Sequence, residues 1–177
     1  NWYIEFHKKK GVNFLFRQQV LSLNTHGNNI LSIKTSNNKT IEIDLLLIAI
    51  GSDPEISLAK KSKLNIKNGV SVNSRMQTND PDIYAVGDCT NFLFNSRNVR
   101  LESIQNAVDQ SKIAASNILK NEENYLPLPW FWSDQYDLKL QIVGLISDIK
   151  AERKIKTLGS KQDHKFSNFI FINNKLI

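Results

Sequence analysis

Residues 78–89 read TNDPDIYAVGDC, and the interpretation of the whole chain starts from this stretch. Its first part, residues 78–82, surrounds a proline with polar side chains and predicts a turn. The apolar run 83–86 favours a strand buried on both faces inside a covered parallel sheet. Gly87 and Asp88 follow where that strand would end, and open parallel sheets bind their ligands beyond that end.

The pair Gly87 and Asp88 suits a ligand better than it suits core packing. Glycine lets the backbone approach a ligand closely. A carboxylate that leaves water needs hydrogen-bond donors, and the hydroxyls of a sugar or ribityl chain are such donors. An aspartate after a strand is common by chance, so the pair becomes informative only together with a second motif.

Two motifs in this order and separation resemble those of one protein family. Residues 78–88 resemble the second flavin-binding motif of the FAD-dependent pyridine-nucleotide disulfide oxidoreductases. The octet PWFWSDQY at 129–136, with LQIVG at 140–144, is similar to the ferredoxin, rubredoxin and putidaredoxin reductases of bacterial oxygenase systems. The resemblance implies FAD and NAD(P)H as cofactors. It also implies electron transfer from NADH through FAD to a small iron-sulfur carrier of the ferredoxin or rubredoxin type.

The resemblance implies an α/β fold class, with an α+β arrangement at the C-terminal end. We expect a partial three-layer FAD/NAD(P)-binding fold, followed by the start of a reductase C-terminal domain with an antiparallel sheet. Residues 1–53 would be the C-terminal part of the NAD(P)-binding domain. Residues 54–124 would be the returning segment of the FAD-binding domain, and residues 125–177 a truncated reductase C-terminal domain.

The resemblance also implies which residues contact the cofactors, and no catalytic side chain is among them, because the cofactor carries the chemistry. Asp88, next to Gly87, would hold the ribityl chain. Residues 100–104 match the family segment that begins a helix at the flavin, so Ser103 and Ile104 would contact the flavin. The expected cofactor-binding set is Gly87, Asp88, Glu102, Ser103, Ile104 and Trp132.

Two members of that set also have structural interpretations, a helix-dipole role for Glu102 and a place in the core of the last domain for Trp132. Glu102 would lie near the nicotinamide, or it would be an acidic first-turn residue that complements the helix dipole. Trp132 would lie against the flavin or the nicotinamide, whereas Trp130 and Phe131 are expected in the core of the last domain.

Composition narrows the class of protein. The chain has 177 residues, of which 41% are hydrophobic and 23% charged, as in ordinary globular proteins. Its net charge of +6 would suit an acidic partner such as a small iron-sulfur protein, or it reflects lysines scattered over the surface. Only Lys8, Lys9 and Lys10 form a basic cluster near aromatic residues, which argues against nucleic-acid binding.

A membrane-spanning helix, an internal disulfide and a metal site are not expected. The longest apolar run, residues 45–50, is far shorter than the ~20 residues of a membrane-spanning helix. Cys89 is the single cysteine, so the chain has no internal disulfide or dithiol pair, and a cytoplasmic location is expected. Around His7 and His26 no further ligand stands at metal-binding spacing, and no metal site is expected.

Periodicity and turn residues predict the elements of the first half. An amphipathic helix over 2–10 would be capped by Gly11. A hairpin would pair 19–23 with 29–35, and a third strand would follow at 40–43. Residues 44–51, apolar throughout and ending in glycine, predict a central strand buried on both faces.

In the second half, a short helix is predicted over 57–62 and a strand over 70–72. Residues 90–98 read as an exposed loop, and 121–126 as a polar linker. A long helix over 101–120 is predicted to bury one face. That face would consist of Leu101, Ile104, Val108, Ala115, Ile118 and Leu119. Antiparallel strands are predicted at 139–145, 151–156 and 167–172, with a hairpin turn at 173–175.

The glycine-rich turn that cradles a pyrophosphate does not occur in the sequence. The seven glycines lie at 11, 27, 51, 69, 87, 144 and 159, too far apart to form it. We therefore expect the chain to be an internal part of a longer reductase. Two alternatives are a non-catalytic NADH-sensing interaction protein of the apoptosis-inducing-factor kind and an inactive truncated fragment.

Overall fold

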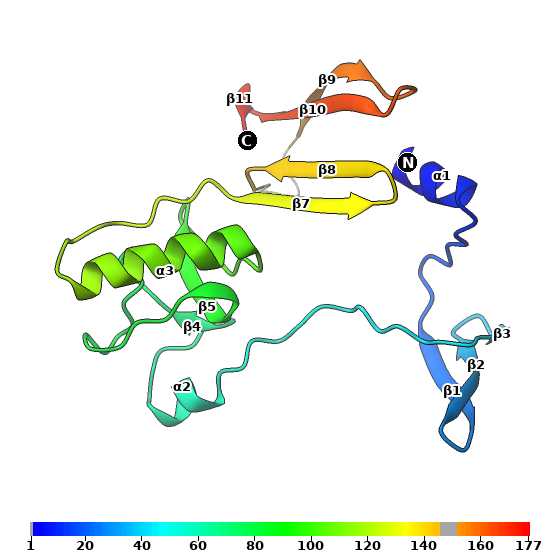
Figure 1. The fold of residues 1–177 in the computed structure, drawn as a ribbon, viewed down its shortest axis with the longest axis horizontal. Coiled ribbons are helices and arrows are strands. Elements are labelled where there is room, and N and C mark those ends of the chain that lie inside the picture. The colour runs from blue at the N-terminus through cyan, green and yellow to red at the C-terminus, as the bar shows by residue number, and fades with distance from the viewer. Residues whose placement is uncertain (1, 146–151) are drawn as a thin grey trace. The chain divides into compact units, whose positions relative to one another are not determined.

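The computed structural model describes residues 2–145 and 152–177. The chain divides into two compact units, Asn1–Ser52 and Asp53–Ile177. The order of elements along the chain can be followed in Figure 1 from blue to red. The structure is a mixed α/β arrangement of small sheets and short helices, as the sequence predicts.

The first unit begins with helix α1, Trp2–Lys9. The helix ends as predicted, because Gly11 has a φ of +90° that other residues adopt at a cost. The N–H of Gly11 donates to the carbonyl of Lys8 at 3.0 Å, and the N–H of Val12 donates to that of His7 at 3.1 Å. These two bonds form a Schellman motif, which satisfies carbonyls at the helix end.

A three-stranded antiparallel sheet follows, in the order β1 (Val20–His26), β2 (Asn29–Thr35) and β3 (Thr40–Glu42). The predicted hairpin is confirmed, with His26 opposite Asn29 across a two-residue turn. Gly27 takes a φ of +59° at the first turn position, where a tight hairpin requires it.

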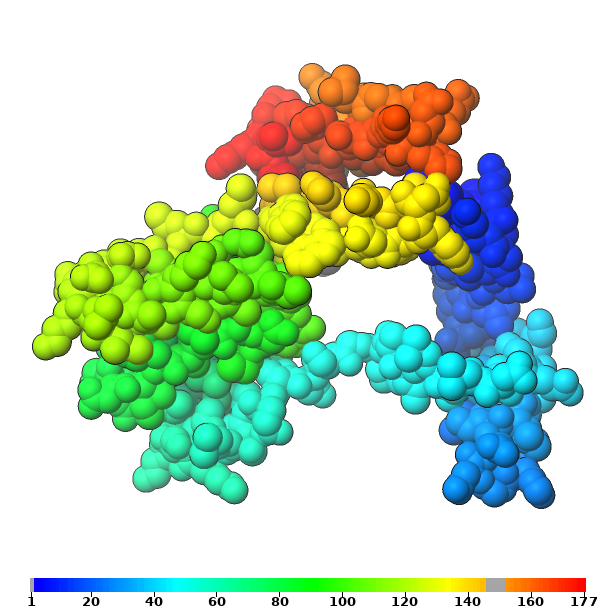
Figure 2. All heavy atoms as spheres, viewed as in Figure 1, coloured from blue at the N-terminus to red at the C-terminus, as the bar shows by residue number. Residues whose placement is uncertain are grey.

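The prediction of a central strand at 44–51 is wrong. The segment has no regular secondary structure, and its side chains face water: Leu45 and Leu47 are 84% exposed and Ile50 is 90% exposed. In Figure 2 the cyan atoms around this segment form a narrow string. A strand needs neighbours for its backbone groups, and no strand among the described residues pairs with this one.

In the second unit, helix α2 (Ser57–Lys61) and strand β4 (Val70–Ser71) occur where they are predicted. β4 pairs in parallel with β5 (Thr90–Phe94), which pairs antiparallel with β6 (Arg97–Val99). Residues 90–98 are therefore not an exposed loop. Thr90, Asn91 and Phe92 are buried, because β5 lies between two partners.

Residues 83–86 do not form the predicted strand. A single bridge joins Gln77 to Tyr84, and the N–H of Ala85 donates to the carbonyl of Met76 at 3.1 Å. The segment is half-buried and packs against the core without a strand on either side of it. β5 follows after residues 87–89 and is the strand that pairs in parallel with β4, as the apolar run was expected to do with a neighbouring strand.

The core of the second unit is a cluster of buried side chains from β5, helix α3 (Ile104–Ile118) and the loops. Its members are Val72, Met76, Phe92, Leu101, Ala114 and Tyr125. Phe92 and Tyr125 meet edge to face with ring centroids 5.4 Å apart. Tyr125 lies in the segment predicted to be a polar linker, and it is only 8% exposed, so that interpretation is wrong at this residue.

Helix α3, Ile104–Ile118, confirms the predicted helix but buries the opposite face. Its buried residues are Asn106, Gln110, Ala114 and Asn117. The predicted apolar positions within α3 are exposed, with Ile104 at 66% and Ile118 at 61%, whereas Leu101, which precedes the helix, is buried as predicted at 6%. Hydrogen bonds explain the choice, because the buried amides satisfy backbone groups of the surrounding loops.

The C-terminal part is antiparallel, as predicted. β7 (Trp130–Gln135) pairs with β8 (Leu138–Val143). A separate three-stranded sheet has the order β11 (Lys175–Leu176), β10 (Lys165–Ile172) and β9 (Lys154–Ser160). Asn173 and Asn174 form the predicted turn, both with positive φ. The beginning of the predicted strand at 151 lies outside the described residues.

Within residues 2–145 and 152–177, no helix is long and apolar enough to cross a membrane.

Tyr125 gives the core a pH dependence at its alkaline limit. Its hydroxyl donates to Asn106 Oδ1 at 2.8 Å. Burial, together with the charge of Asp109, raises the pKa of Tyr125 from 10.0 to about 12. The folded state thus holds this proton more tightly than the unfolded chain. The contribution of Tyr125 to the free energy of unfolding is therefore fully present below pH 10 and is lost as the pH rises toward 12.

We expect Tyr125→Phe to remove this alkaline loss while lowering stability at neutral pH by about 1–3 kcal/mol, because Asn106 loses a buried partner. Urea unfolding at neutral pH and near pH 12 measures both effects. Tyr136→Phe is the matched control, because Tyr136 is 58% exposed. Equal alkaline losses in wild type and Tyr125→Phe would show that another group is responsible.

Candidate functional site

The predicted site begins at a sharp backbone turn. Val86 is extended, with φ −142° and ψ 157°, and Gly87 then has a φ of +81° at the start of the single 3₁₀ turn η1, Gly87–Cys89. The N–H of Gly87 donates to Gln110 Oε1 at 2.7 Å. The carbonyl of Gly87 accepts from the N–H and, at 2.8 Å, from the hydroxyl of Thr90. Both polar groups of this glycine are therefore held by buried partners.

Asp88 points away from this buried turn. The residue is exposed, although Gly87 before it and Thr90 after it are buried. Its carboxylate makes no hydrogen bond with any residue that the structure describes. The charged carboxylate of Asp88 is therefore exposed to solvent, next to a glycine whose backbone groups are both hydrogen-bonded.

Arg100 connects Asp88 with Glu102. The Nη1 atom of Arg100 donates to the backbone carbonyl of Asp88 at 3.4 Å and also to Glu102 Oε1. The guanidinium side chain is only 13% exposed, whereas that of Glu102 is 41% exposed. The arginine links the backbone of Asp88 to the carboxylate of Glu102, a link that the sequence motif does not reveal.

The N-terminus of α3 lies in the same region, because α3 packs against η1. Ser103 is the N-cap, with its hydroxyl accepting from the N–H of Asn106 at 3.2 Å. The N–H groups of Ile104 and Gln105 have no acceptor among the residues that the structure describes. Such free donors and the helix dipole make this end attractive to negative charge.

Trp132 lies on β7 and belongs to a different surface. Its ring stacks on Trp130, with centroids 5.0 Å apart and planes inclined by 27°, and it remains 44% exposed. Both rings line an open depression, together with Asp134, Lys139, Leu140 and Gln141. Phe131 instead packs against the core cluster, as expected for a core residue.

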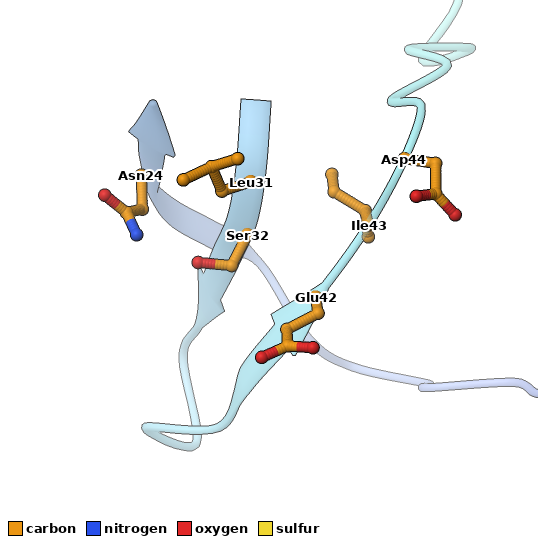
Figure 3. Close-up of a pocket in the computed structure, with 6 residues that line it drawn as sticks. All are labelled: Asn24, Leu31, Ser32, Glu42, Ile43 and Asp44. Carbon is orange, nitrogen blue, oxygen red and sulfur yellow. The ribbon is translucent and has the colours of Figure 1, made fainter. Parts of the chain in front are cut away.

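An open depression in the first unit involves none of the predicted residues. Figure 3 shows its lining, which comes from β1, β2 and β3 and the two residues after β3. The lining residues are Asn24, Leu31, Ser32, Glu42, Ile43 and Asp44. Across the described parts of the chain, no group of three or more acidic, histidine or cysteine side chains could hold a metal ion.

Comparison with known proteins identifies the family. Residues 1–111 match the family described as pyridine nucleotide-disulphide oxidoreductase, and residues 130–177 match the reductase C-terminal family. The chain therefore belongs to the pyridine nucleotide-disulphide oxidoreductases. Reductases of this family use FAD and NAD(P)H.

Within the family, the most similar relatives include reductases of small electron carriers. The chain is 34% identical to rhodocoxin reductase of Rhodococcus erythropolis over 173 residues, or 97% of this chain and 40% of the relative. It is 32% identical to putidaredoxin reductase CamA of Pseudomonas putida, over 99% of this chain and 42% of the relative.

Solved structures agree with this placement. The ferredoxin reductase for the CYP199A2 system from Rhodopseudomonas palustris superposes with a TM-score of 0.93 at 31% identity, covering 99% of this chain and 43% of that one. The chain thus spans about 40% of the length of the relatives that it matches.

The sequence motifs do not reveal Gln110, Thr90 or Arg100 as neighbours of the turn at Gly87. The first two are buried polar residues that hold Gly87, and a glutamine within a predicted helix is typical of the surface. Arg100 was included only as part of the matched segment 100–104. Its proximity to Asp88 depends on the β5–β6 hairpin, which the sequence analysis did not predict.

The cap at Ser103 can be tested by substitution. Ser103→Ala removes the acceptor of the Asn106 N–H, and we expect a loss of about 0.5–2 kcal/mol in the free energy of unfolding. Ser111→Ala is the control, because the Ser111 hydroxyl only donates to the Ala107 carbonyl within the helix. Ser103→Asp should restore most of the loss. Urea unfolding of the three variants measures these differences, and equal losses at 103 and 111 would contradict the assignment.

Proposed function

We propose that the protein is an FAD-dependent NAD(P)H oxidoreductase that passes electrons from NADH through FAD to a ferredoxin- or rubredoxin-type carrier. The observation that carries the proposal is the exposed, unengaged Asp88 on a glycine turn whose backbone is fixed by buried partners. The named reductases among its relatives support the same function.

The residues present fit an FAD. Asp88 offers a carboxylate acceptor to ribityl hydroxyls. A Cβ at Gly87 would meet Ala107 Cβ at 3.5 Å, so the positive φ, not a lack of space, is what requires glycine. The free N–H groups at the start of α3 would favour negative charge on the pyrimidine side of the flavin.

When bound, FAD supplies the chemistry, accepting two electrons from the nicotinamide and releasing them singly. The protein's own residues would bind and orient it. Ser103 and Ile104 would contact the flavin, and Glu102, held by Arg100, would lie at the nicotinamide side. Trp132 would cover one ring and restrict water, for which its 44% exposed face leaves room.

The partner follows from the relatives and from charge. Putidaredoxin reductase has been solved in a covalent complex with putidaredoxin, and this chain superposes on that reductase with a TM-score of 0.88 at 32% identity. A net charge of +6 would attract an acidic carrier and speed its association at low salt.

The assignment of residue ranges to domains is part of the proposal. Residues 1–53 would belong to the NAD(P)-binding domain, 54–124 to the FAD-binding domain and 125–177 to the C-terminal reductase domain. The surfaces left open in the chain, such as the apolar side of α3, would then be covered within the complete reductase.

The full gene product tests the activity directly. After purification with FAD and removal of free flavin, we expect a flavin absorption band and steady reduction of an added ferredoxin or rubredoxin by NADH. Omission of the carrier is the control for direct oxidation by oxygen. A flavin that NADH reduces, with no transfer to any added iron-sulfur protein, would instead favour an NADH-sensing interaction protein.

Asp88→Ala should weaken FAD binding roughly ten- to hundredfold, because a hydrogen bond to a charged acceptor is worth ~1.5–3 kcal/mol. Asp88→Asn, which keeps one acceptor oxygen, should lose less. Asp82→Ala removes an exposed carboxylate upstream of the turn and serves as the control for net charge. Equilibrium titration of the apoprotein with FAD measures the affinities, and unchanged FAD retention in Asp88→Ala would refute the role of Asp88.

A further inference from the structure

Gln110 stands out because it is fully buried and yet polar. It lies in the middle of α3 with no exposed surface. Its Oε1 atom accepts from the N–H of Gly87 at 2.7 Å and lies 2.9 Å from the hydroxyl oxygen of Thr90. One side chain thus joins the helix to the turn that presents Asp88, by its bond to Gly87, and lies beside Thr90.

The orientation of the amide shows which contact decides its placement. Gln110 Nε2 is buried and has no hydrogen-bond partner among the described residues. A buried donor without an acceptor is costly and calls for an explanation. Turning the amide over would place the NH₂ group against the N–H of Gly87, leaving two donors face to face. The side chain therefore leaves its own donor unsatisfied in order to accept from Gly87.

The bond to Gly87 fixes the backbone that leads to Asp88. The chain changes from extended at Val86 to a φ of +81° at Gly87, and a buried N–H at such a turn needs an acceptor. Thr90 holds the carbonyl of the same residue with its N–H and its hydroxyl. Both backbone groups of Gly87 are thus held by buried partners, and the side chain of the next residue, Asp88, is exposed.

We infer that Gln110 is a positioning residue for the flavin. It holds the Gly87 turn so that the Asp88 carboxylate meets the ribityl hydroxyls in a preset geometry. Gln110 acts through Gly87 and Asp88, not by contact with the cofactor. The inference rests on the proposed function, because it assigns a role at the same site.

The test compares two buried amides of the same helix in the full gene product. Gln110→Met keeps the length of the side chain and removes its hydrogen bonds. Asn117→Leu is the matched control, because Asn117 is 8% exposed and donates to the carbonyls of Arg75 and Glu123 at 3.3 and 2.8 Å, not to the turn at Gly87. FAD titration of each apoprotein gives the affinity, visible circular dichroism of the bound flavin reports its setting, and urea unfolding of the apoprotein gives the stability.

We expect Gln110→Met to bind FAD roughly tenfold or more weakly and to alter the flavin circular dichroism, since one hydrogen bond of about 1.4 kcal/mol corresponds to that factor. Asn117→Leu should lower apoprotein stability with the affinity and spectrum unchanged. Gln110→Glu should restore most of the affinity, because the buried carboxyl stays neutral and keeps an oxygen for the Gly87 N–H.

The outcomes separate this role from the proposed function. Flavin-loaded wild type with equally tight binding by Gln110→Met would overturn the positioning role alone. So would losses of affinity that follow apoprotein stability equally in the Gln110 and Asn117 variants. A wild-type protein that retains no flavin would overturn the proposed function, and the positioning role with it.

Discussion

The second unit depends on a hydrogen bond between a helix side chain and a glycine, from the N–H of Gly87 to Gln110 Oε1. Loops carry backbone groups that lack partners, and an amide side chain offers both a donor and an acceptor. Three amides on one side of α3 use this property. Asn106 donates to the carbonyl of Leu101, and Gln110 accepts from the N–H of Gly87. Asn117 donates to the carbonyls of Arg75 and Glu123.

This polar anchoring determines what α3 presents to the outside. With its amides turned inward, the helix exposes an apolar stripe at helical spacing, formed by Ile104, Val108, Ile118 and Leu119. In the first unit, Leu45, Leu47, Ile48 and Ile50 are exposed as well. Exposed apolar side chains grouped on one side of a helix are typical of faces that another part of a protein covers. A chain that spans about 40% of its relatives' length is expected to carry such faces.

Local chemistry was predictable from the sequence, and long-range pairing was not. Gly11 and the hairpin turns at Gly27 and Asn173 were predicted because each depends on its own backbone angles. The helix at 101–120 was also predicted. Its apolar period, however, marks a face of the helix that is not the one packed against the core in this structure. The strands at 44–51 and 83–86 failed because an apolar run needs partner strands, and the β5–β6 hairpin was missed because Asn95 and Ser96 make its turn without glycine.

The same limits apply to the site. Gly87 and Asp88 were singled out from a short motif, whereas the cap at Ser103 was not predicted. Gln110 becomes visible only when residues 20 and 23 positions apart are brought together. Those short separations bear on the order of folding. Contacts that close small loops form quickly, so the turn at Gly87 can assemble while distant parts of the chain are still unstructured. The newly made chain would then form the turn that presents Asp88 before other parts of the protein cover the apolar surfaces around it.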